Sequence, residues 1–235
     1  MQRRAATRCD VLPDGAPGYL DAGGPVAGLA DGLILDGDGR PTCFWGGSGA
    51  MMAHYHDTEW GFPVAEEHLL FEKICLEGFQ SGLSWRTVLA KRPAFREVFH
   101  DFHYEAVARM GDADVERLLR DARIIRHRGK IAATLNNARR ACELAEAHGS
   151  LGAFVWRYAP APGSRRPPQT RAEMVSTSTE SSQLAKDLKK QGWRFFGPTT
   201  AYAFMQAMGM VDDHLVGCHV REACEEARAA FVRPS

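Results

Sequence analysis

The sequence lacks long hydrophobic runs. No segment approaches the roughly 18 consecutive apolar residues that a membrane-spanning helix needs. The N-terminal stretch MQRRAATRCDVLPDG also lacks the apolar core of a secretory signal. These absences predict a cytoplasmic protein with no membrane partner.

The sequence also lacks net charge and a dense set of cysteines. Lys and Arg total 29, as do Asp and Glu, so the protein has no overall positive charge that would attract a polyanion. Any surface that binds nucleic acid must therefore be a local one. The six cysteines are scattered over 235 residues, which argues against a disulfide framework. In a reducing compartment such thiols serve as core residues or metal ligands. We expect a monomer.

The first 42 residues contain no Lys, Glu, Phe or Trp, yet they hold eight of the 23 glycines. A segment of this composition buries little apolar surface. We therefore predict a flexible N-terminal extension over residues 1–42 and a single domain over residues 43–235. The formal charge of that domain is +2, from 25 basic and 23 acidic residues.

The domain has helical periodicity and no convincing run of alternating strand residues. Leu70 and Ile74 stand at i and i+4, the spacing that places apolar groups on one helix face. Ser84 is a plausible N-cap, Pro93 suits the start of a new helix, and residues 128–149 indicate a long helix that ends at glycine. Two further helices are predicted over residues 181–192 and 199–209. The fold class is therefore predicted to be all-α.

Cysteine and histidine residues near both ends of the domain form a candidate metal set. His214 and Cys218 stand at i and i+4, a spacing able to chelate one ion, and Cys43 and His56 lie near the start of the domain. Two Cys and two His would make a closed tetrahedral zinc site. The alternative is a core cysteine near a surface histidine. Three more residues could compete as ligands: His54, His219 and Cys224.

Glu77 lies in the apolar segment ICLEGFQSGLSW. A carboxylate in apolar surroundings is costly unless it is hydrogen-bonded, so it usually has a function or a partner. Nearby aromatic residues suggest a site that stacks on a flat ring: Trp45, Tyr55, Trp60 and Trp85. The alternatives are an exposed glutamate at a helix C-terminus and aromatic side chains that only pack the core.

Basic residues gather in LLRDARIIRHRGKIAA, where one helix ends and another begins: Arg123, Arg126, Arg128 and Lys130. Free backbone N–H groups at a helix N-terminus favour a phosphate. The pattern fits a helix-hairpin-helix motif, over about residues 115–140, that grips a DNA backbone without reading sequence. The alternative is a solvated basic helix start. A second basic group around Lys186 is interpreted as a solvated helix face.

Taken together, these motifs resemble the 3-methyladenine DNA glycosylase I family. The resemblance spans about residues 43–218 in order and spacing. It rests on CFW from Cys43, YHDTEWG from Tyr55, LFEKICLEGFQSGLSW from Leu70, ARIIRHRGKI from Ala122 and FFGPTTAYAFMQAMGMVDDHLVGC from Phe195.

The resemblance implies an all-α helix-hairpin-helix glycosylase fold with one structural Zn²⁺ that joins the N- and C-terminal parts of the domain. Matched motif by motif, the implied zinc ligands are Cys43, His56, His214 and Cys218. Glu77 would recognise the methylated adenine, with Trp45, Tyr55 and Trp85 around the base. The implied DNA contacts are Leu83, which would fill the gap left by the flipped nucleotide, and Arg126, Arg128 and Lys130.

Two positions depart from the family pattern. Arg123 stands where we expect Gly in the hairpin, which would cause strain if that position requires a positive φ. Asp212 stands where Asn is frequent, beside an implied zinc ligand.

The implied activity is monofunctional. The enzyme would flip 3-methyladenine out of double-stranded DNA and hydrolyse its N-glycosidic bond, releasing the free base and leaving an abasic site without strand cleavage. Two alternatives remain open. One is a non-enzymatic, zinc-stapled helix-hairpin-helix DNA-binding module, and the other is a glycosylase for another damaged base or a hydrolase of free nucleosides.

Overall fold

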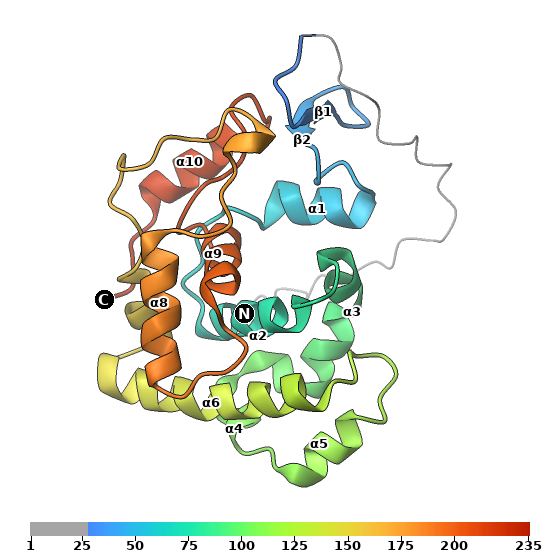
Figure 1. Ribbon diagram of the computed structural model, residues 1–235, viewed down its shortest axis with the longest axis vertical. Helices are drawn as coiled ribbons and strands as arrows, with labels where there is room; N and C mark the ends of the chain where they lie inside the picture. Colours follow the sequence, from blue (N-terminus) through green and yellow to red (C-terminus); the bar gives the residue numbers. More distant parts are fainter. Residues whose placement is uncertain (1–27) are drawn as a thin grey trace, which may run out of the picture.

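A computed structural model of the protein describes residues 28–235. The first 27 residues of the expected flexible extension lie outside the described residues. Figure 1 shows a mostly helical chain with one small β-hairpin. The elements are β1 (Leu33–Leu35), β2 (Pro41–Cys43), α1 (Ala50–Thr58), α2 (Glu67–Gln80), α3 (Trp85–Val98), α4 (Tyr104–Ala108), α5 (Asp112–Leu118), α6 (Arg128–His148), α7 (Leu151–Trp156), α8 (Thr179–Lys190), α9 (Pro198–Ala207) and α10 (Arg221–Ala230), with 3₁₀ turns at His100–Phe102 and Arg171–Glu173.

The β-hairpin was not predicted from the sequence. β1 pairs antiparallel with β2 so that Leu33 faces Cys43. The Asp36 carboxylate accepts the N–H groups of Asp38 and Arg40 and so closes the turn. Because Leu33 packs in a small buried cluster with Cys218, part of the segment assigned to the extension belongs to the folded core. The fold is therefore mostly, rather than entirely, helical.

Helix α2 runs through the centre of the main core, between α9 and α6 (Figure 1). It is apolar on nearly every side, and ten of its 14 residues are buried. It contacts α3, α6, α7 and α9. A helix buried all round carries its charged residues into the interior with it. This property of α2 determines the chemistry of the site described below.

Local sequence rules predict several helix ends correctly. The Ser84 hydroxyl caps α3 by accepting the N–H of Thr87 at 3.2 Å. α6 ends before Gly149, whose φ of +86° is the conformation that favours glycine. The predicted helix start at Pro93 is wrong, because Pro93 lies inside α3. Buried side chains on both sides of Pro93, Val88 and Phe95 among them, keep the two halves in one helix.

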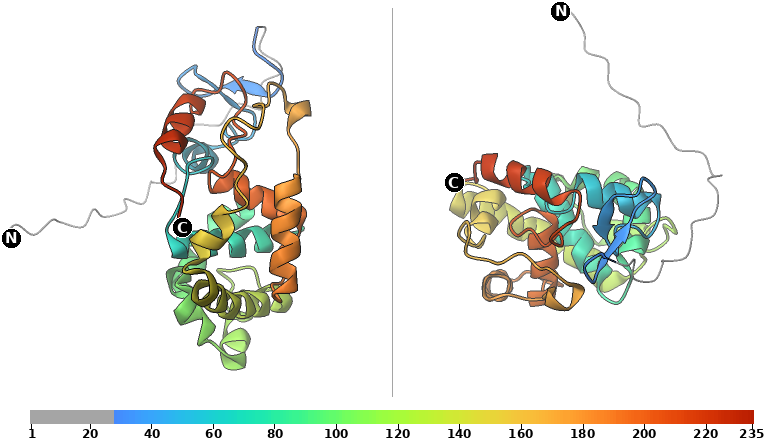
Figure 2. Two further views of the ribbon diagram at one scale, coloured as in Figure 1. Left: turned by 90° about the vertical axis from the view of Figure 1, so that its left-hand side faces the viewer. Right: turned by 90° about the horizontal axis from the view of Figure 1, so that it is seen from above.

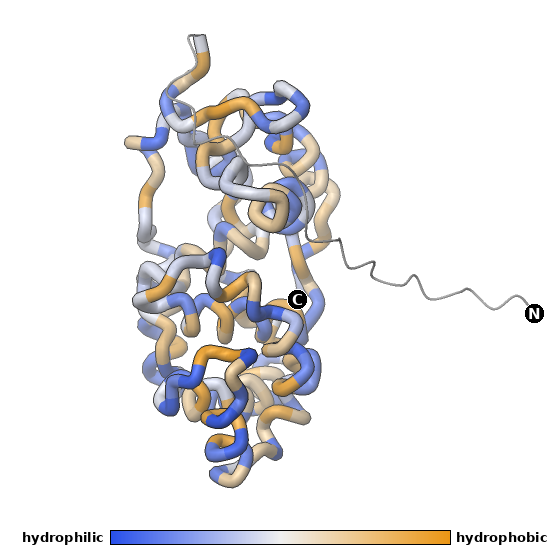
Figure 3. Tube along the Cα trace, turned by 90° about the vertical axis from the view of Figure 1, so that its right-hand side faces the viewer, coloured by the Kyte–Doolittle hydropathy of each residue, from blue (hydrophilic) through white to orange (hydrophobic). Residues whose placement is uncertain are grey.

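The molecule is elongated, with the β-hairpin at one end and α5 at the other (Figures 1 and 2). Hydrophilic and hydrophobic segments alternate along the coloured part of the trace in Figure 3. No helix among residues 28–235 is both long enough and apolar enough to cross a membrane.

Candidate active site and metal centre

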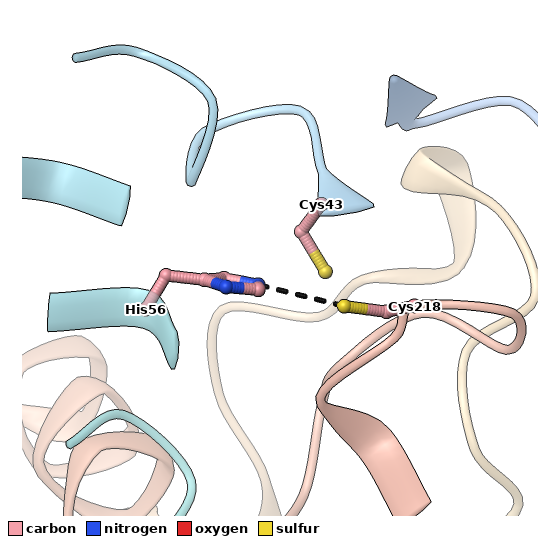
Figure 4. Close-up of side chains that lie close together, drawn as sticks. All are labelled: Cys43, His56 and Cys218. Atoms are coloured by element: carbon pink, nitrogen blue, oxygen red, sulfur yellow. Dashed lines mark hydrogen bonds between the residues drawn. The ribbon is translucent and has the colours of Figure 1, made fainter. Parts of the chain in front are cut away.

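Cys43, His56 and Cys218 meet at the β-hairpin end of the molecule. Cys43 ends β2, His56 lies in α1, and Cys218 lies in the loop before α10 (Figure 4). Their ligand atoms lie within 4.8 Å of one another, and all three residues are buried. The structure thus brings together three of the four expected zinc ligands, from segments about 160 residues apart in the sequence.

Hydrogen bonds orient the histidine and activate one thiol of this group. His56 Nδ1 contacts the Asp57 carboxylate at 2.7 Å, and His56 Nε2 points to Cys218 Sγ at 3.6 Å. The hydrogen bond with Cys43 lowers the pKa of Cys218 to about 3, and His56 acts in the same direction. The same contact raises the pKa of Cys43. A thiolate beside a correctly oriented imidazole is a typical metal-binding donor set.

His214, the fourth expected ligand, lies beside this group and not within it. Its Nδ1 contacts Asp212 at 2.8 Å, and its ring centroid lies 4.8 Å from that of His56. The other ring nitrogen, Nε2, is buried without a hydrogen-bond partner. Since buried polar atoms normally have partners, this orphaned nitrogen fits a metal ligand. Asp212 fixes the ring in the way a carboxylate supports a metal-binding histidine.

Of the three competing ligands, Cys224 is hydrogen-bonded and His54 is exposed, whereas His219 Nε2 is buried without a hydrogen-bond partner in the described chain. Cys224 Sγ donates to the Gly61 carbonyl at 2.8 Å. His219 Nε2 faces the carboxylates of Asp36 and Asp57 at 3.7 and 3.5 Å. His54 is exposed. Among these seven residues, Cys43, His56 and Cys218 form one compact donor group, while His214 lies in a neighbouring group with Asp212 and Cys224.

Glu77 lies in the last turn of α2 and is only 6% exposed, which overturns the alternative of an exposed glutamate. Burial and, next to it, the Glu77 charge raise the pKa of Tyr55 from α1, and Trp85 at the start of α3 lies beside the Tyr55 ring. Their ring centroids are 5.3 Å apart, and Trp45 lies 6.3 Å from Tyr55. No hydrogen bond or ion pair involving Glu77 forms within residues 28–235. We call Trp45, Tyr55, Glu77 and Trp85, together with Lys73, the Glu77 cluster.

Lys73 is the member of the Glu77 cluster that the sequence analysis missed. It lies one turn before Glu77 on α2 and is 1% exposed. Its ammonium donates to the Tyr55 hydroxyl at 2.8 Å. It also lies 4.5 Å from the ring centroid of Tyr55 and 4.3 Å from that of Trp85. The signal was present in the sequence, because Lys73 and Glu77 stand at i and i+4 in a helix that is apolar on nearly every side.

Burial shifts the pKa values of both charged groups of the cluster toward neutral pH. It raises the pKa of Glu77 to about 7, while the Lys73 ammonium acts in the opposite direction. It lowers the pKa of Lys73 to about 8, while the Glu77 carboxylate raises it. Titratable groups with such shifts are typical of functional sites.

The loop after α2 presents Leu83 to solvent, 42% exposed, beside Gly82 with a φ of +79°. Lys130 does not occupy the position expected of a phosphate-binding residue. Its side chain is buried, and its ammonium donates to the carbonyls of Phe79 and Ser81 at 2.9 and 2.5 Å. The assignment of Lys130 to a DNA contact is therefore wrong. Its role is to attach the start of α6 to the end of α2, next to Leu83.

The other basic residues of the turn between α5 and α6 are exposed. Arg126 has no hydrogen bond or ion pair in the described part of the chain, whereas Arg128 makes a bidentate pair with Glu116 at 2.6 and 2.9 Å. Arg123 pairs with Asp121 and Glu97. The backbone of Arg123 is not in the left-handed region, so this residue causes no strain there.

Comparison with known proteins gives a consistent result. The family model for methyladenine glycosylase matches residues 45–222. DNA-3-methyladenine glycosylase 1 of Escherichia coli K12 is 47% identical over 180 residues, which cover 75% of this chain and 94% of the relative.

Solved structures agree with the family match. A crystal structure of 3-methyladenine DNA glycosylase I has a TM-score of 0.73 at 43% identity, covering 76% of this chain and 98% of that one. Another, in complex with 3-methyladenine, has a TM-score of 0.71 at 34% identity, covering 74% and 94%. The chain belongs to the methyladenine glycosylase family.

Proposed function

We propose that this protein removes 3-methyladenine from alkylated DNA by hydrolysing the N-glycosidic bond, leaving an abasic site without strand cleavage. The observation that carries this proposal is the Glu77 cluster, where a buried carboxylate without a hydrogen-bond partner in the described chain lies among aromatic rings. An acceptor of this kind suits a flat, cationic base that presents an amine. The rival of a DNA-binding module without activity does not account for it.

Recognition follows from the chemistry of the substrate. Adenine alkylated at N3 carries a positive charge while it is attached to the sugar, so the glycosidic bond is weak and the leaving group needs no general acid. Glu77 would accept a hydrogen bond from the exocyclic amine. Tyr55 and Trp85 would stack on the base and add cation–π attraction that neutral adenine receives less of. Trp45 would close the wall of the site.

Lys73 is assigned a positioning role at this site. Because an ammonium only donates, its bond to the Tyr55 hydroxyl occupies an acceptor position and leaves the phenol proton free to donate elsewhere. The Lys73 charge also offsets that of Glu77. A cationic base stacked on Tyr55 and Trp85 would compete with the ammonium for the same rings, so binding would favour the neutral amine form of Lys73.

Zinc, held by Cys43, His56, His214 and Cys218, would act as a structural ion that fills its coordination shell with protein ligands. The donor geometry and the orphaned His214 Nε2 support this proposal. Trp45 lies two residues after Cys43, Tyr55 directly precedes His56, and the rings of Trp45 and His56 are 4.9 Å apart. Fixing the ligands would therefore also fix one wall of the base-binding site.

The DNA face would consist of Leu83 and the turn between α5 and α6, used as a helix-hairpin-helix motif on double-stranded DNA. Leu83 would fill the gap left by the flipped base, and Arg126 would contact a phosphate. Arg128 would do so after leaving Glu116. Since all parts of this face come from one chain, we propose that a monomer acts, in the cytoplasm where free thiols persist.

The decisive experiment measures release of free 3-methyladenine from methylated duplex DNA. The parent protein should release the base and leave abasic sites in unbroken strands. Glu77→Gln keeps the shape and one acceptor but removes the charge, so excision should fall by about ten- to a hundredfold, the loss of one charged hydrogen bond. Duplex binding without release would support the DNA-binding module. Release of another base, or cleavage of free nucleosides, would support the other alternative.

A further inference from the structure

A cavity of about 580 Å³ lies between α10, the loop around Met210 and the proline-rich segment 160–167, and no residue of the Glu77 cluster lines it. In Figure 1, α10 lies on the opposite side of the molecule from α3 and α5. The volume is in the range that small-molecule sites occupy. Nothing in the proposed glycosylase activity uses this cavity.

The residues that line the cavity have a strong excess of positive charge. Two carboxylates, Asp212 and Glu225, face five arginines, an excess of three positive charges in a protein with 29 residues of each sign. The arginines are Arg165, Arg166, Arg221, Arg228 and Arg233.

Most of the arginines that line the cavity have no carboxylate partner in the part of the chain that the structure describes. Arg221 pairs with Glu225 and lies 3.7 Å from Asp212, so one arginine already faces both acids. Arg165 is engaged by the Tyr202 hydroxyl at 2.6 Å and by Asp213 at 3.1 Å. Three guanidinium groups around the cavity therefore remain without a carboxylate partner in the described chain.

Backbone carbonyls hold two of these three groups in place. Arg228 donates to the carbonyls of Gly209 and Met210 at 2.8 and 3.1 Å, and Arg233 donates to that of Pro160 at 3.0 Å. A carbonyl orients a guanidinium without neutralising its charge. Arg166 is exposed and forms no hydrogen bond or ion pair within residues 28–235. Like charges fixed around one cavity favour an anion, and planar guanidinium groups suit phosphate oxygens.

The remaining wall of the cavity is apolar. Trp156 and Phe231 lie with ring centroids 4.6 Å apart, and the Arg233 guanidinium lies 6.0 Å from the Trp156 ring. Pro63 and Pro167 also line the cavity. We propose that this cavity is a second binding site, which takes a small phosphorylated molecule with a flat aromatic body, of the nucleotide class. The phosphates would meet the arginines and the flat group would lie against Phe231.

Calorimetry at physiological ionic strength with pyrophosphate and with ADP tests the proposal on the full chain. Arg166→Ser should lower the affinity for both ligands by about tenfold, as expected for one lost charged contact. The matched control is Arg109→Ser, another exposed arginine whose side chain has no described partner and which lies outside the proposed DNA face, and it should leave both affinities unchanged. Phe231→Leu should lower the affinity for ADP by about threefold or more and leave the affinity for pyrophosphate unchanged, because only ADP has a ring to stack.

Three results would overturn the proposal. One is the absence of binding at millimolar pyrophosphate and ADP, and another is an equal loss in the two arginine variants, which would indicate unspecific attraction. The third is a loss of duplex DNA binding in Arg166→Ser as large as the loss of ADP binding, which would assign the arginines to a DNA backbone. Base release should be normal in Arg166→Ser, so the outcome does not depend on the glycosylase activity.

Discussion

Lys73 and Glu77 lie one helical turn apart on α2, and both are buried, with the Lys73 ammonium over the rings of Tyr55 and Trp85. The pair is therefore close to neutral as a unit while both groups are ionised. A site that selects a cationic base by charge is weakened by this arrangement. The lysine sets how strongly the site prefers cations, and its removal should change that preference.

Replacing Lys73 by Met should increase the preference for a cationic base. Met retains an apolar side chain of similar length and removes the positive charge near the rings of Tyr55 and Trp85. We expect affinity for an adenine with a fixed positive charge, dimethylated for example, to rise by about tenfold, equal to 1.4 kcal/mol, while that for neutral adenine changes little. Calorimetry measures both. Lys186→Met, on the exposed face of α8, is the control, and an equal change for the two bases would contradict the assignment.

Binding of the same fixed cation should strengthen as pH rises from 6 to 9. Glu77, whose pKa is raised to about 7, gains its negative charge as pH rises through that value. Lys73, whose pKa is lowered to about 8, loses its positive charge as pH rises further. Both changes favour a cation, each by at most tenfold per pH unit.

The variants separate the two steps of this pH profile. Glu77→Gln should remove the lower step. Lys73→Met should remove the upper step and move the lower step to higher pH, because the Lys73 ammonium no longer lowers the pKa of Glu77. Arg92, Glu59 and Glu72 also act on Lys73, but they are present in both variants. A flat profile in the parent protein would show that neither group titrates in this range.

Much of the fold follows from rules that act over a few residues. The cap at Ser84 and the glycine that ends α6 are local signals, and the structure bears them out. At Pro93 the local rule gives the wrong helix boundary. Its missing N–H predicts a helix boundary, but burial of residues on both sides outweighs the lost hydrogen bond and α3 continues through it.

The errors at the site concern lysines whose partners are distant in the sequence. Lys130 stands in a basic segment, and only the packing of α6 on α2 shows that it bonds carbonyls about 50 residues earlier. Lys73 was overlooked because a lysine in a helix is usually exposed. The many apolar residues of α2 were the sign that Lys73 would be buried. The β-hairpin has strands of three residues, too short for alternation to be visible.

Zinc should be bound at one ion per chain, and its loss should destabilise the protein. Cys218→Ser would leave Cys43, His56 and His214 buried with an incomplete set of ligands. We expect metal content near zero by elemental analysis and a Tm at least about 5 °C lower, since 1 kcal/mol corresponds to about 2–4 °C in a chain of this size. Cys142→Ser, at a half-buried thiol outside the metal group, should keep the metal. A metal-free parent protein with unchanged thermal stability would refute the site.

Duplex DNA binding should depend on salt and on Arg126 and Arg128, two of the exposed arginines at the turn between α5 and α6 and the start of α6. Arg126→Glu with Arg128→Glu should remove two phosphate contacts and reduce the log–log salt slope of binding by about 1.8, at about 0.9 per contact. Charge reversal of Lys186 and Lys189 on α8 gives the same change in net charge and should leave the slope unaltered.

Glu116→Gln is the opposite test. It releases Arg128 from its bidentate pair and should strengthen duplex binding and steepen the slope. Weaker binding in Glu116→Gln would mean that the pair holds Arg128 in its DNA-binding position, and equal losses in both double variants would mean that the turn has no special role.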